Sequence, residues 1–338
     1  MSNEFNSLVD VVVPIRNGEK WLSGLLLTIS DQTYKPNKLI LVDDHSDLPI
    51  EIKMIEQRQI PSVIIHSAIG RGLSNARNEG IDLCTSEYIA FLDVDDRWSP
   101  KKLEKHIEFL ENNSKFVAVF SNASTIDLEG QVLRNHISSV SEVSTECLIL
   151  EKTPVLGSAS SIVIRRKQIL ETGYFDLDLN YAEDLDYWIR LSTTGKIGCL
   201  PEILTFITEN PHSMQRGITP LEKYTKEISS KLYIFKKHPN FLPEVVENLG
   251  RTLLFVMIDK SITFGEKVKL LRMTIRSKTL SSFYSFTLFL TFLIKNFLNL
   301  TVKVLSRKAY LSVAIPFHFV KKVFATMIFV VKMKKRRE

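Results

Sequence analysis

The 338-residue sequence predicts an α/β fold: a mostly parallel central sheet flanked by helices, followed by a mainly helical C-terminal region. In the first half, short β-branched runs alternate with segments of helical periodicity, a pattern typical of strand–helix–strand crossovers. From Glu222 onward the sequence is mostly helical. A hydrophobic content of 44% and a charged content of 24% are ordinary for a globular chain, so disorder is not expected.

The predicted elements of the first half follow one another in order. Buried strands are expected within residues 8–15, 38–46, 62–67, 87–96 and 116–123. Helices are expected within residues 17–32, 72–84 and 99–113. Ser74 is the predicted N-cap of the second helix, and Ser99 with Pro100 is predicted to open the third.

The region after residue 150 has a more mixed pattern. Residues 157–166 predict a loop that enters a strand, and residues 166–175 predict a short helix with Gly173 near its end. Residues 183–195 predict a helix closed by Gly195. We expect two domains, an α/β domain over residues 1–218 and a basic, apolar helical region over residues 219–338.

The charge is distributed unevenly along the chain. Residues 267–337 contain 16 Lys/Arg and no Asp/Glu, whereas residues 1–266 contain 28 Lys/Arg and 37 Asp/Glu. An acidic body with a basic tail indicates that the tail meets an anionic surface, either membrane or nucleic acid. The three cysteines lack metal-ligand spacing, which fits a reducing cytosol. We expect no signal peptide, because no basic segment followed by a long apolar stretch is found near residue 1.

Acidic side chains collect where two predicted strands end. Asp44 follows the second strand, and Asp93 and Asp95 follow the fourth. In parallel α/β sheets, ligands bind outside the carboxyl ends of the strands, so these residues are expected in one crevice. Two carboxylates can share Mg²⁺ or Mn²⁺, which prefer oxygen ligands. The structural alternatives are a solvated acidic turn for the pair and an Asx-type turn for Asp44.

Two further groups carry possible chemistry. Arg77 lies near a predicted helix start, where it suits an anionic ligand or an ion pair with acids of neighbouring strands. Glu183 and Asp184 open another predicted helix, where a carboxylate can act as a general base or can cap the helix. Neither a dinucleotide fingerprint nor a P-loop is found.

Five stretches in this order together resemble the family 2 glycosyltransferases of GT-A fold. They are VVVPIRNGEKWL, LILVDDHS, GLSNARNEGI, YIAFLDVDDRW and EDLDYWIRL, and the resemblance covers roughly residues 8–216. It implies an inverting enzyme that moves a sugar from a nucleotide donor, with UDP-sugars favoured. It also implies Mg²⁺ or Mn²⁺ as cofactor. A non-catalytic nucleotide-sugar-binding protein of the same fold is the alternative.

The resemblance also implies roles for individual residues. Asp184 is expected to be the catalytic base, with Glu183 helping to place donor or acceptor. Asp95, with Asp93, is expected to hold the metal. The remaining donor-site residues are expected near the base, ribose or diphosphate, and they are Pro14, Arg16, Asp44, Arg77, His212 and Arg216. Trp188 and Arg190 are interpreted as structural. No QxxRW motif follows the base, which favours transfer of a single sugar.

The C-terminal region contains apolar runs that bear on where the protein is located. The longest uncharged run, residues 279–294, has 16 residues, whereas a membrane-spanning helix needs about 20. Short apolar runs separated by Lys/Arg favour association with an anionic membrane surface. A packed helical domain, a dimer surface and one tilted span remain alternatives. We expect a cytoplasmic enzyme at the inner face of the cell membrane, with a glycan or lipid-linked acceptor in surface-polysaccharide biosynthesis. Nucleic acid is not an expected partner.

Overall fold

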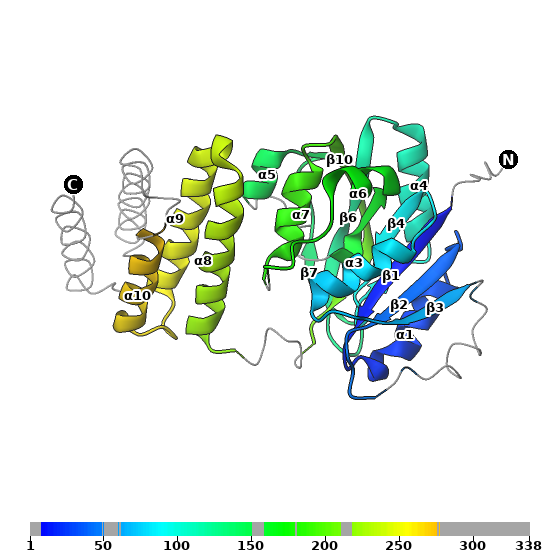
Figure 1. Cartoon of the computed structure of the whole chain (residues 1–338), viewed down its shortest axis with the longest axis horizontal. Coiled ribbons are helices and arrows are strands. Elements are labelled where there is room, and N and C mark those ends of the chain that lie inside the picture. Colours follow the sequence, from blue (N-terminus) through cyan, green and yellow to red (C-terminus); the bar gives the residue numbers. More distant parts are fainter. Residues whose placement is uncertain are drawn as a thin grey trace, which may run out of the picture. The chain divides into compact units, whose positions relative to one another are not determined.

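The computed structural model describes residues 8–48, 50, 60, 62–150, 159–179, 181–210, 218–275 and 277. The chain divides into two compact units, residues 1–217 and 218–338 (Figure 1). The predictions for His212, for Arg216 and for the apolar runs of the tail from residue 279 lie outside the described residues.

A mixed sheet forms the centre of the first unit. Its strands in chain order are β1 Val9–Ile15, β2 Lys38–Asp43, β3 Val63–Ser67, β4 Tyr88–Phe91, β5 Arg97–Trp98, β6 Phe116–Ile126, β7 Val132–His136, β8 Glu142–Val143, β9 Ile162–Arg165 and β10 Lys196–Thr208. Their spatial order is β3-β2-β1-β4-β9-β6-β10-β5, with β7 beside β6 and β8 beside β10. The central strands β1 and β4 are wholly buried, which is why their sequences are apolar except for Asp10.

The predicted α/β class is confirmed, and the strand directions add one feature to it. Strands β1, β2, β3 and β4 run parallel to one another, and β6 runs parallel to β10. Strand β9 lies between these two groups and pairs antiparallel with both β4 and β6. Its short segment comes directly before a helix in the sequence, and direction is not readable from residue pattern alone.

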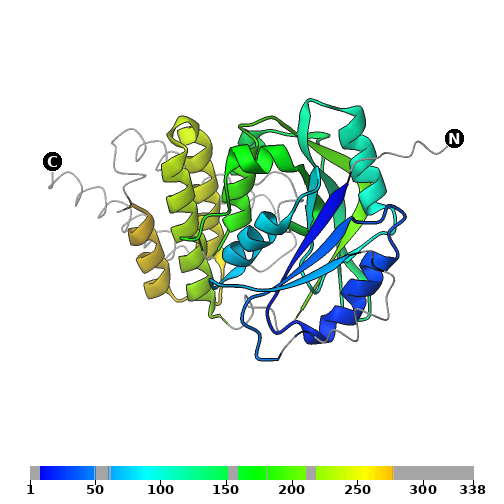
Figure 2. The same cartoon turned by 45° about the vertical axis from the view of Figure 1, so that its right-hand side comes forward.

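Helices cover both faces of the sheet (Figure 2). Those of the first unit are α1 Glu19–Ser30, α3 Leu73–Leu83, α4 Lys102–Asn112, α5 Thr145–Ile149, α6 Arg166–Thr172 and α7 Glu183–Leu191, with the short 3-10 helix η2 at Ala159–Ser161. Along β1, Val11 and Val13 belong to a core shared with α1 and α4. Val12 points the other way, against Gly80 of α3. Because side chains alternate along β1, this one buried strand packs against α1 and α4 on one face of the sheet and against α3 on the other.

Two predicted helix starts are wrong by two residues or fewer. The N-cap of α3 is Gly72, whose φ of +97° suits glycine, and Ser74 is the second residue of the helix. The N-cap of α4 is Lys101, because the amide of Lys102 is bonded to the Ser99 carbonyl at 3.0 Å and residues 99–101 form a turn.

The second unit contains helices α8 Pro220–Lys237, α9 Leu242–Ile258 and α10 Phe264–Ile275, and the 3-10 helix η3 at Pro239–Phe241. Helix α8 begins with a capping box, in which Thr219 and Glu222 bond to each other's backbone amides. Its Ile228 and Ile234 are buried, as are Leu249 and Leu253 of α9. Among the described residues, none of the helices has the length and hydropathy of a membrane span.

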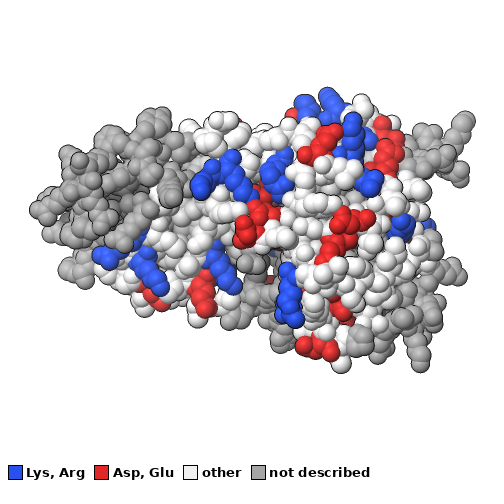
Figure 3. All heavy atoms as spheres, in the orientation of Figure 1, with Lys and Arg blue, Asp and Glu red and all other residues white. Residues whose placement is uncertain are grey.

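Acidic and basic side chains are interspersed on the surface of the first unit. Figure 3 shows Lys and Arg in blue beside Asp and Glu in red over the face of this unit that is in view. Over the described residues of that face no extended field of one sign forms. In the sequence, the excess of basic residues lies in residues 267–337.

Candidate active site

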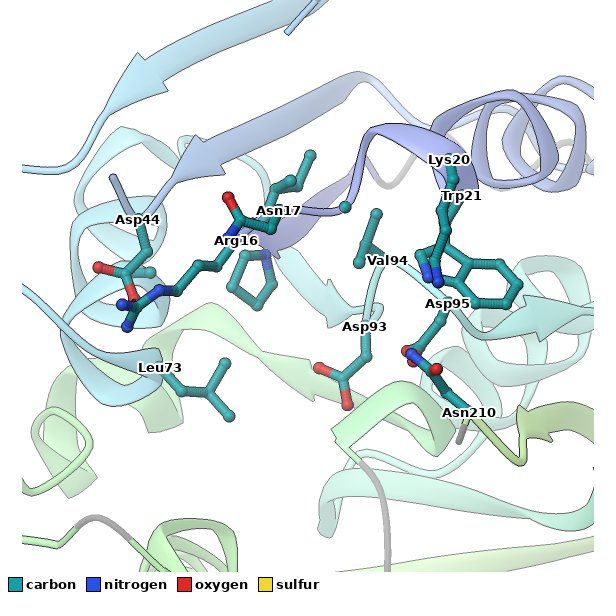
Figure 4. A pocket seen from close by; sticks show the side chains of 14 residues that line it. Arg16, Asn17, Lys20, Trp21, Asp44, Leu73, Asp93, Val94, Asp95 and Asn210 are labelled. Carbon is teal, nitrogen blue, oxygen red and sulfur yellow. Dashed lines mark hydrogen bonds and ion pairs between the residues drawn. The ribbon is translucent and has the colours of Figure 1, made fainter. Parts of the chain in front are cut away.

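A cavity of about 590 Å³ opens at the carboxyl ends of the central strands (Figure 4). Five of the residues predicted for the donor site line it, namely Pro14, Arg16, Asp44, Asp93 and Asp95. Strands β1, β2 and β4 deliver them, because parallel neighbours end at the same edge of the sheet. The cavity is also lined by Lys20, Trp21 and Asn210, which the sequence pattern did not single out.

Asp44 occupies one end of the cavity. Its side chain is only 7% exposed, and the Gly72 amide donates to both carboxylate oxygens at 3.0 Å. The guanidinium of half-exposed Arg16 approaches Asp44 Oδ2 to 4.0 Å and points toward it in Figure 4. Asp43, the neighbour of Asp44, faces the following loop instead, where its Oδ1 accepts the Ser46 amide at 3.0 Å. Asp44 is therefore held by the start of α3 and still faces the cavity.

Asp93 and Asp95 lie in a turn after β4, away from Asp44. The Asp96 amide donates to the Asp93 carbonyl at 3.0 Å and closes this turn. The Asn210 amide group donates to Asp95 Oδ2 at 3.0 Å, from the end of β10. Burial, with the nearby charge of Asp93, raises the pKa of Asp95. Asp93 and Asp95 thus bring two carboxyl groups to this part of the cavity.

Asp96 does not line the cavity. It is 4% exposed and accepts from Ser160 Oγ at 2.6 Å and from the Thr208 amide at 3.0 Å. Burial, with Asp93 and Asp95 close by, raises its pKa well above the usual range. Asp96 is the last residue of the turn that begins at Asp93, and it is not at the start of α4, which begins only at Lys102.

Arg77 joins the cavity to the start of α7. Its side chain is 2% exposed, and its Nη2 and Nη1 donate to Asp93 Oδ1 at 3.0 Å and to Glu183 Oε1 at 2.9 Å. Burial by itself would lower the pKa of Arg77, but the two carboxylates outweigh it and raise it. Arg77 lies behind the cavity wall, so it orders two acids rather than reaching into the cavity.

Glu183 and Asp184 open α7, and neither lines the cavity. The residue before them, Ala182, adopts a left-handed conformation with φ of +58°, which turns the chain sharply into the helix. Desolvation by surrounding protein raises the pKa of Asp184 to about 7, and Glu183 contributes to the rise while Arg77 opposes it. Asp184 can therefore exchange a proton near neutral pH.

Trp188 and Arg190, interpreted as structural, hold α7 in place. Trp188 is wholly buried and meets Phe120 and Phe175 edge to face. Arg190 pairs with buried Asp186 at 2.8 Å, and its Nη1 and Nη2 donate to the carbonyls of two residues in the preceding segment. Helix α7 is thus held by its buried hydrophobic side chains and by the contacts of Arg190. Its first turn contains the two acids Glu183 and Asp184.

The donor set of the cavity fits a magnesium-type ion bound together with a phosphate ligand. Among the described residues, no three His, Cys, Asp or Glu side chains are grouped closely enough to form a metal site alone. Asp93 and Asp95 nevertheless offer two carboxylates to one cavity. Mg²⁺ is usually held by one or two carboxylates plus substrate phosphates and water, so the pair is sufficient when the substrate supplies the rest.

Comparisons with known proteins agree on one family. The model described as glycosyl transferase family 2 matches residues 10–171. An uncharacterized glycosyltransferase of Methanocaldococcus jannaschii is 30% identical over 202 residues, covering 58% of this chain and 69% of that protein. A Bacillus subtilis protein provisionally named a teichuronic acid biosynthesis glycosyltransferase, TuaG, is 26% identical over 194 residues, covering 56% of this chain and 73% of that protein.

Other relatives are longer than the shared region. The chain spans 34% of an uncharacterized Rickettsia bellii glycosyltransferase and 62% of one from Haemophilus influenzae. Among solved structures, Staphylococcus aureus TarS 1–349 in complex with UDP-GlcNAc superimposes with a TM-score of 0.53 at 16% identity. That match covers 81% of this chain and 73% of TarS 1–349. At this identity the likeness concerns the fold.

Proposed function

The chain belongs to the family 2 glycosyltransferases of GT-A fold, and we propose that it moves a single sugar from a nucleotide-sugar to an acceptor hydroxyl with inversion. The favoured donor is a UDP-sugar, and the acceptor is a glycan or a lipid-linked glycan of a cell-surface polymer. The provisional name of TuaG and the complex of TarS with UDP-GlcNAc support these choices.

The observation that carries the proposal is the distribution of charge in the cavity. Asp44 and Arg16 line one part of it, and Asp93 and Asp95 line another. A carboxylate oxygen of Asp44 suits the N3–H group of uracil. A purine base does not present this donor group. The Asp93–Asp95 pair suits a diphosphate carried by a divalent cation. A nucleoside diphosphate matches both parts of one cavity.

The chemistry is a single displacement. Asp93 and Asp95 would hold Mg²⁺ or Mn²⁺, which when bound supplies positive charge to the departing diphosphate. Asp184 takes the proton of the acceptor hydroxyl as the acceptor oxygen bonds to the anomeric carbon. The bond from that carbon to the diphosphate oxygen breaks, and the nucleoside diphosphate leaves with its electron pair. Arg77 keeps Asp93 and Glu183 in fixed positions during this step.

The basic tail supports a location for this reaction. Residues 267–337 carry 16 Lys/Arg and no Asp/Glu, with apolar runs between them. Each Lys/Arg near an anionic leaflet contributes about 1 kcal/mol to binding. We place the enzyme in the cytoplasm at the inner face of the cell membrane, where lipid-linked acceptors are presented.

A donor screen tests the proposal. The full-length protein is incubated with UDP- and GDP-sugars in Mn²⁺, Mg²⁺ or chelator, and release of the nucleoside diphosphate is measured. We expect release from a UDP-sugar with metal, increased by a suitable acceptor, and loss of release with chelator. Binding of UDP-sugars without release under any condition would favour the non-catalytic alternative. Binding of neither nucleotide class would contradict the proposal.

A further inference from the structure

We infer that Ser160 is a positioning residue for the diphosphate part of the proposed donor site, a role that rests on the proposed function. Ser160 lies in η2, 64 residues from Asp96 in the sequence, and is wholly buried. It does not line the cavity. It touches instead both ends of the turn that presents Asp93 and Asp95.

One hydroxyl group makes both contacts. The Asp93 amide donates to Ser160 Oγ at 3.0 Å, and Ser160 Oγ donates to Asp96 Oδ2 at 2.6 Å. The first and last residues of the four-residue turn are thereby joined through a single oxygen atom. The second distance lies at the short end of the range for O–H···O hydrogen bonds.

The rest of the turn is fixed from two other directions. The Ser160 carbonyl accepts Trp98 Nε1 at 2.8 Å, just beyond the turn. At the end of β10, the Thr208 amide donates to Asp96 Oδ1 at 3.0 Å. The β10 end also carries Asn210, which bonds to Asp95. Ser160 therefore connects η2 to a turn that the end of β10 holds from the other side.

Only a small hydroxyl residue satisfies this geometry. Alanine would leave the part-buried Asp93 amide and the buried Asp96 Oδ2 each without the Ser160 hydroxyl, which allows the turn to rearrange. The carboxylates of Asp93 and Asp95 would then meet the cation and diphosphate in altered positions. The Asp44 part of the cavity, held by Gly72, would keep its contacts.

The test separates the two parts of the cavity. The full-length protein is titrated calorimetrically with UDP in Mn²⁺ and in chelator, and melting temperatures are recorded for every variant. We expect Ser160→Ala to weaken UDP binding about tenfold in Mn²⁺, because the turn no longer holds Asp93 and Asp95 in one position. In chelator we expect its UDP affinity to stay within about twofold of wild type, because the Asp44 contacts are kept. Ser160→Thr, which keeps the hydroxyl, should restore the Mn²⁺ effect.

Controls make the outcome specific. Ser121→Ala removes another wholly buried hydroxyl, which is bonded to Thr205 Oγ1 at 3.3 Å, and should leave both affinities unchanged. Ser160→Cys, of similar volume but a weaker hydrogen-bonding group, carries the test if Ser160→Ala does not fold.

Two results would overturn the inference. In the first, Ser160→Ala and Ser160→Cys both keep the wild-type gain in affinity with Mn²⁺. In the second, affinity falls equally with Mn²⁺ and with chelator, as general destabilisation would cause. If the wild-type protein binds no UDP, or binds it no better with Mn²⁺ than with chelator, the proposed function and this inference are both overturned. Such a result is distinguishable from failure of the inference alone, because it is seen in the wild-type protein without any substitution.

Discussion

At the scale of single residues, the acids around Arg77 decide what the site can do. Arg77 pairs with Asp93 and Glu183, whereas Asp184 is crowded by protein and by Glu183, which raises its pKa to about 7. The same cluster thus contains two acids that are held by a cation and one acid whose pKa is near neutral. A carboxyl group whose pKa is shifted in this way is a feature of catalytic sites.

Asp184→Asn is expected to reduce sugar transfer by at least about 10²-fold, because an amide cannot accept the acceptor proton. UDP binding should remain within about threefold of wild type, since Asp184 does not line the cavity. The wild-type kcat/KM should rise as pH increases through about 7, because the raised pKa keeps Asp184 protonated and inactive below it. Transfer assays from about pH 5.5 to about 8.5 test both points, and unchanged transfer by Asp184→Asn would remove Asp184 from the mechanism.

A second single-residue prediction concerns stability. Lys102 is wholly buried over the Trp98 ring, at 4.4 Å from its centroid, and its Nζ has no hydrogen-bond partner among the described residues. Burial lowers its pKa well below 10.5, so the folded state binds fewer protons than the unfolded state. Stability is therefore diminished at neutral pH and recovers as pH rises toward 10.5.

Lys102→Met is expected to increase the free energy of unfolding at pH 7 by about 1–3 kcal/mol, because an apolar side chain of similar length needs no partner. The gain should shrink at about pH 10, where the unfolded lysine is also partly deprotonated. Denaturant unfolding at the two pH values measures this. Lys167→Met, at a side chain that is 80% exposed, is the control and should change stability little. If Lys102→Met is no more stable than wild type at neutral pH, the Lys102 ammonium group is stabilised in the folded protein and the prediction is wrong.

At the scale of elements, the packing of α3 on β1 sets the position of Arg77. Gly80 of α3 lies against β1 so closely that a Cβ atom there would be 2.3 Å from Val12 Cγ1. The helix can approach the sheet only because this residue has no side chain. Arg77 lies one turn earlier in the same helix, so its reach to Asp93 and Glu183 depends on that approach.

Gly80→Ala is expected to destabilise the first unit by about 1–3 kcal/mol, because overpacking of the α3–β1 contact outweighs the gain in helix propensity. Gly24→Ala is the matched control in helix α1, where the added Cβ would meet only the flexible Arg97 side chain at 3.5 Å. That variant should be neutral or more stable by up to about 1 kcal/mol. Thermal unfolding compares the two, and equal melting temperatures would contradict the packing argument.

At the scale of the whole molecule, charge divides the sequence into two parts of different composition. Residues 1–266 have more acidic than basic residues, and residues 267–337 have only basic ones. An acidic body repels phosphate backbones, whereas a basic, apolar tail is attracted to anionic lipid. The cavity lies in the first unit, so the proposed substrate chemistry and the proposed membrane attachment belong to different parts of the sequence.

The full-length protein is expected to sediment with vesicles containing about 30% anionic lipid and to be released as salt is raised from about 0.05 to about 0.5 M, because salt screens surface charge. Neutral vesicles should retain much less protein. Fluorescent single-stranded oligonucleotides serve as the comparison. Tighter, salt-dependent binding to oligonucleotides than to anionic vesicles would contradict the membrane assignment.

Several features of fold and site were predictable because they depend on local pattern. Continuous apolar runs identified the buried strands, and the acids that follow them identified the edge of the sheet where the cavity lies. Asp44, Asp93 and Asp95 therefore appear in the cavity as expected. Asn210 was missed, although it too follows a strand, because a single amide has no distinctive spacing.

The sequence by itself determined the α/β class, the family, and the acids available for chemistry, because periodicity and motif order are properties of neighbouring residues. Only the tertiary structure decided how those acids are used. Burial of Arg77 between Asp93 and Glu183, the antiparallel insertion of β9, and the Ser160 contact that joins Asp93 to Asp96 each connect distant segments. The free energies of ion pairing and burial depend on which residues are in contact. Those contacts form only when the complete sheet has packed.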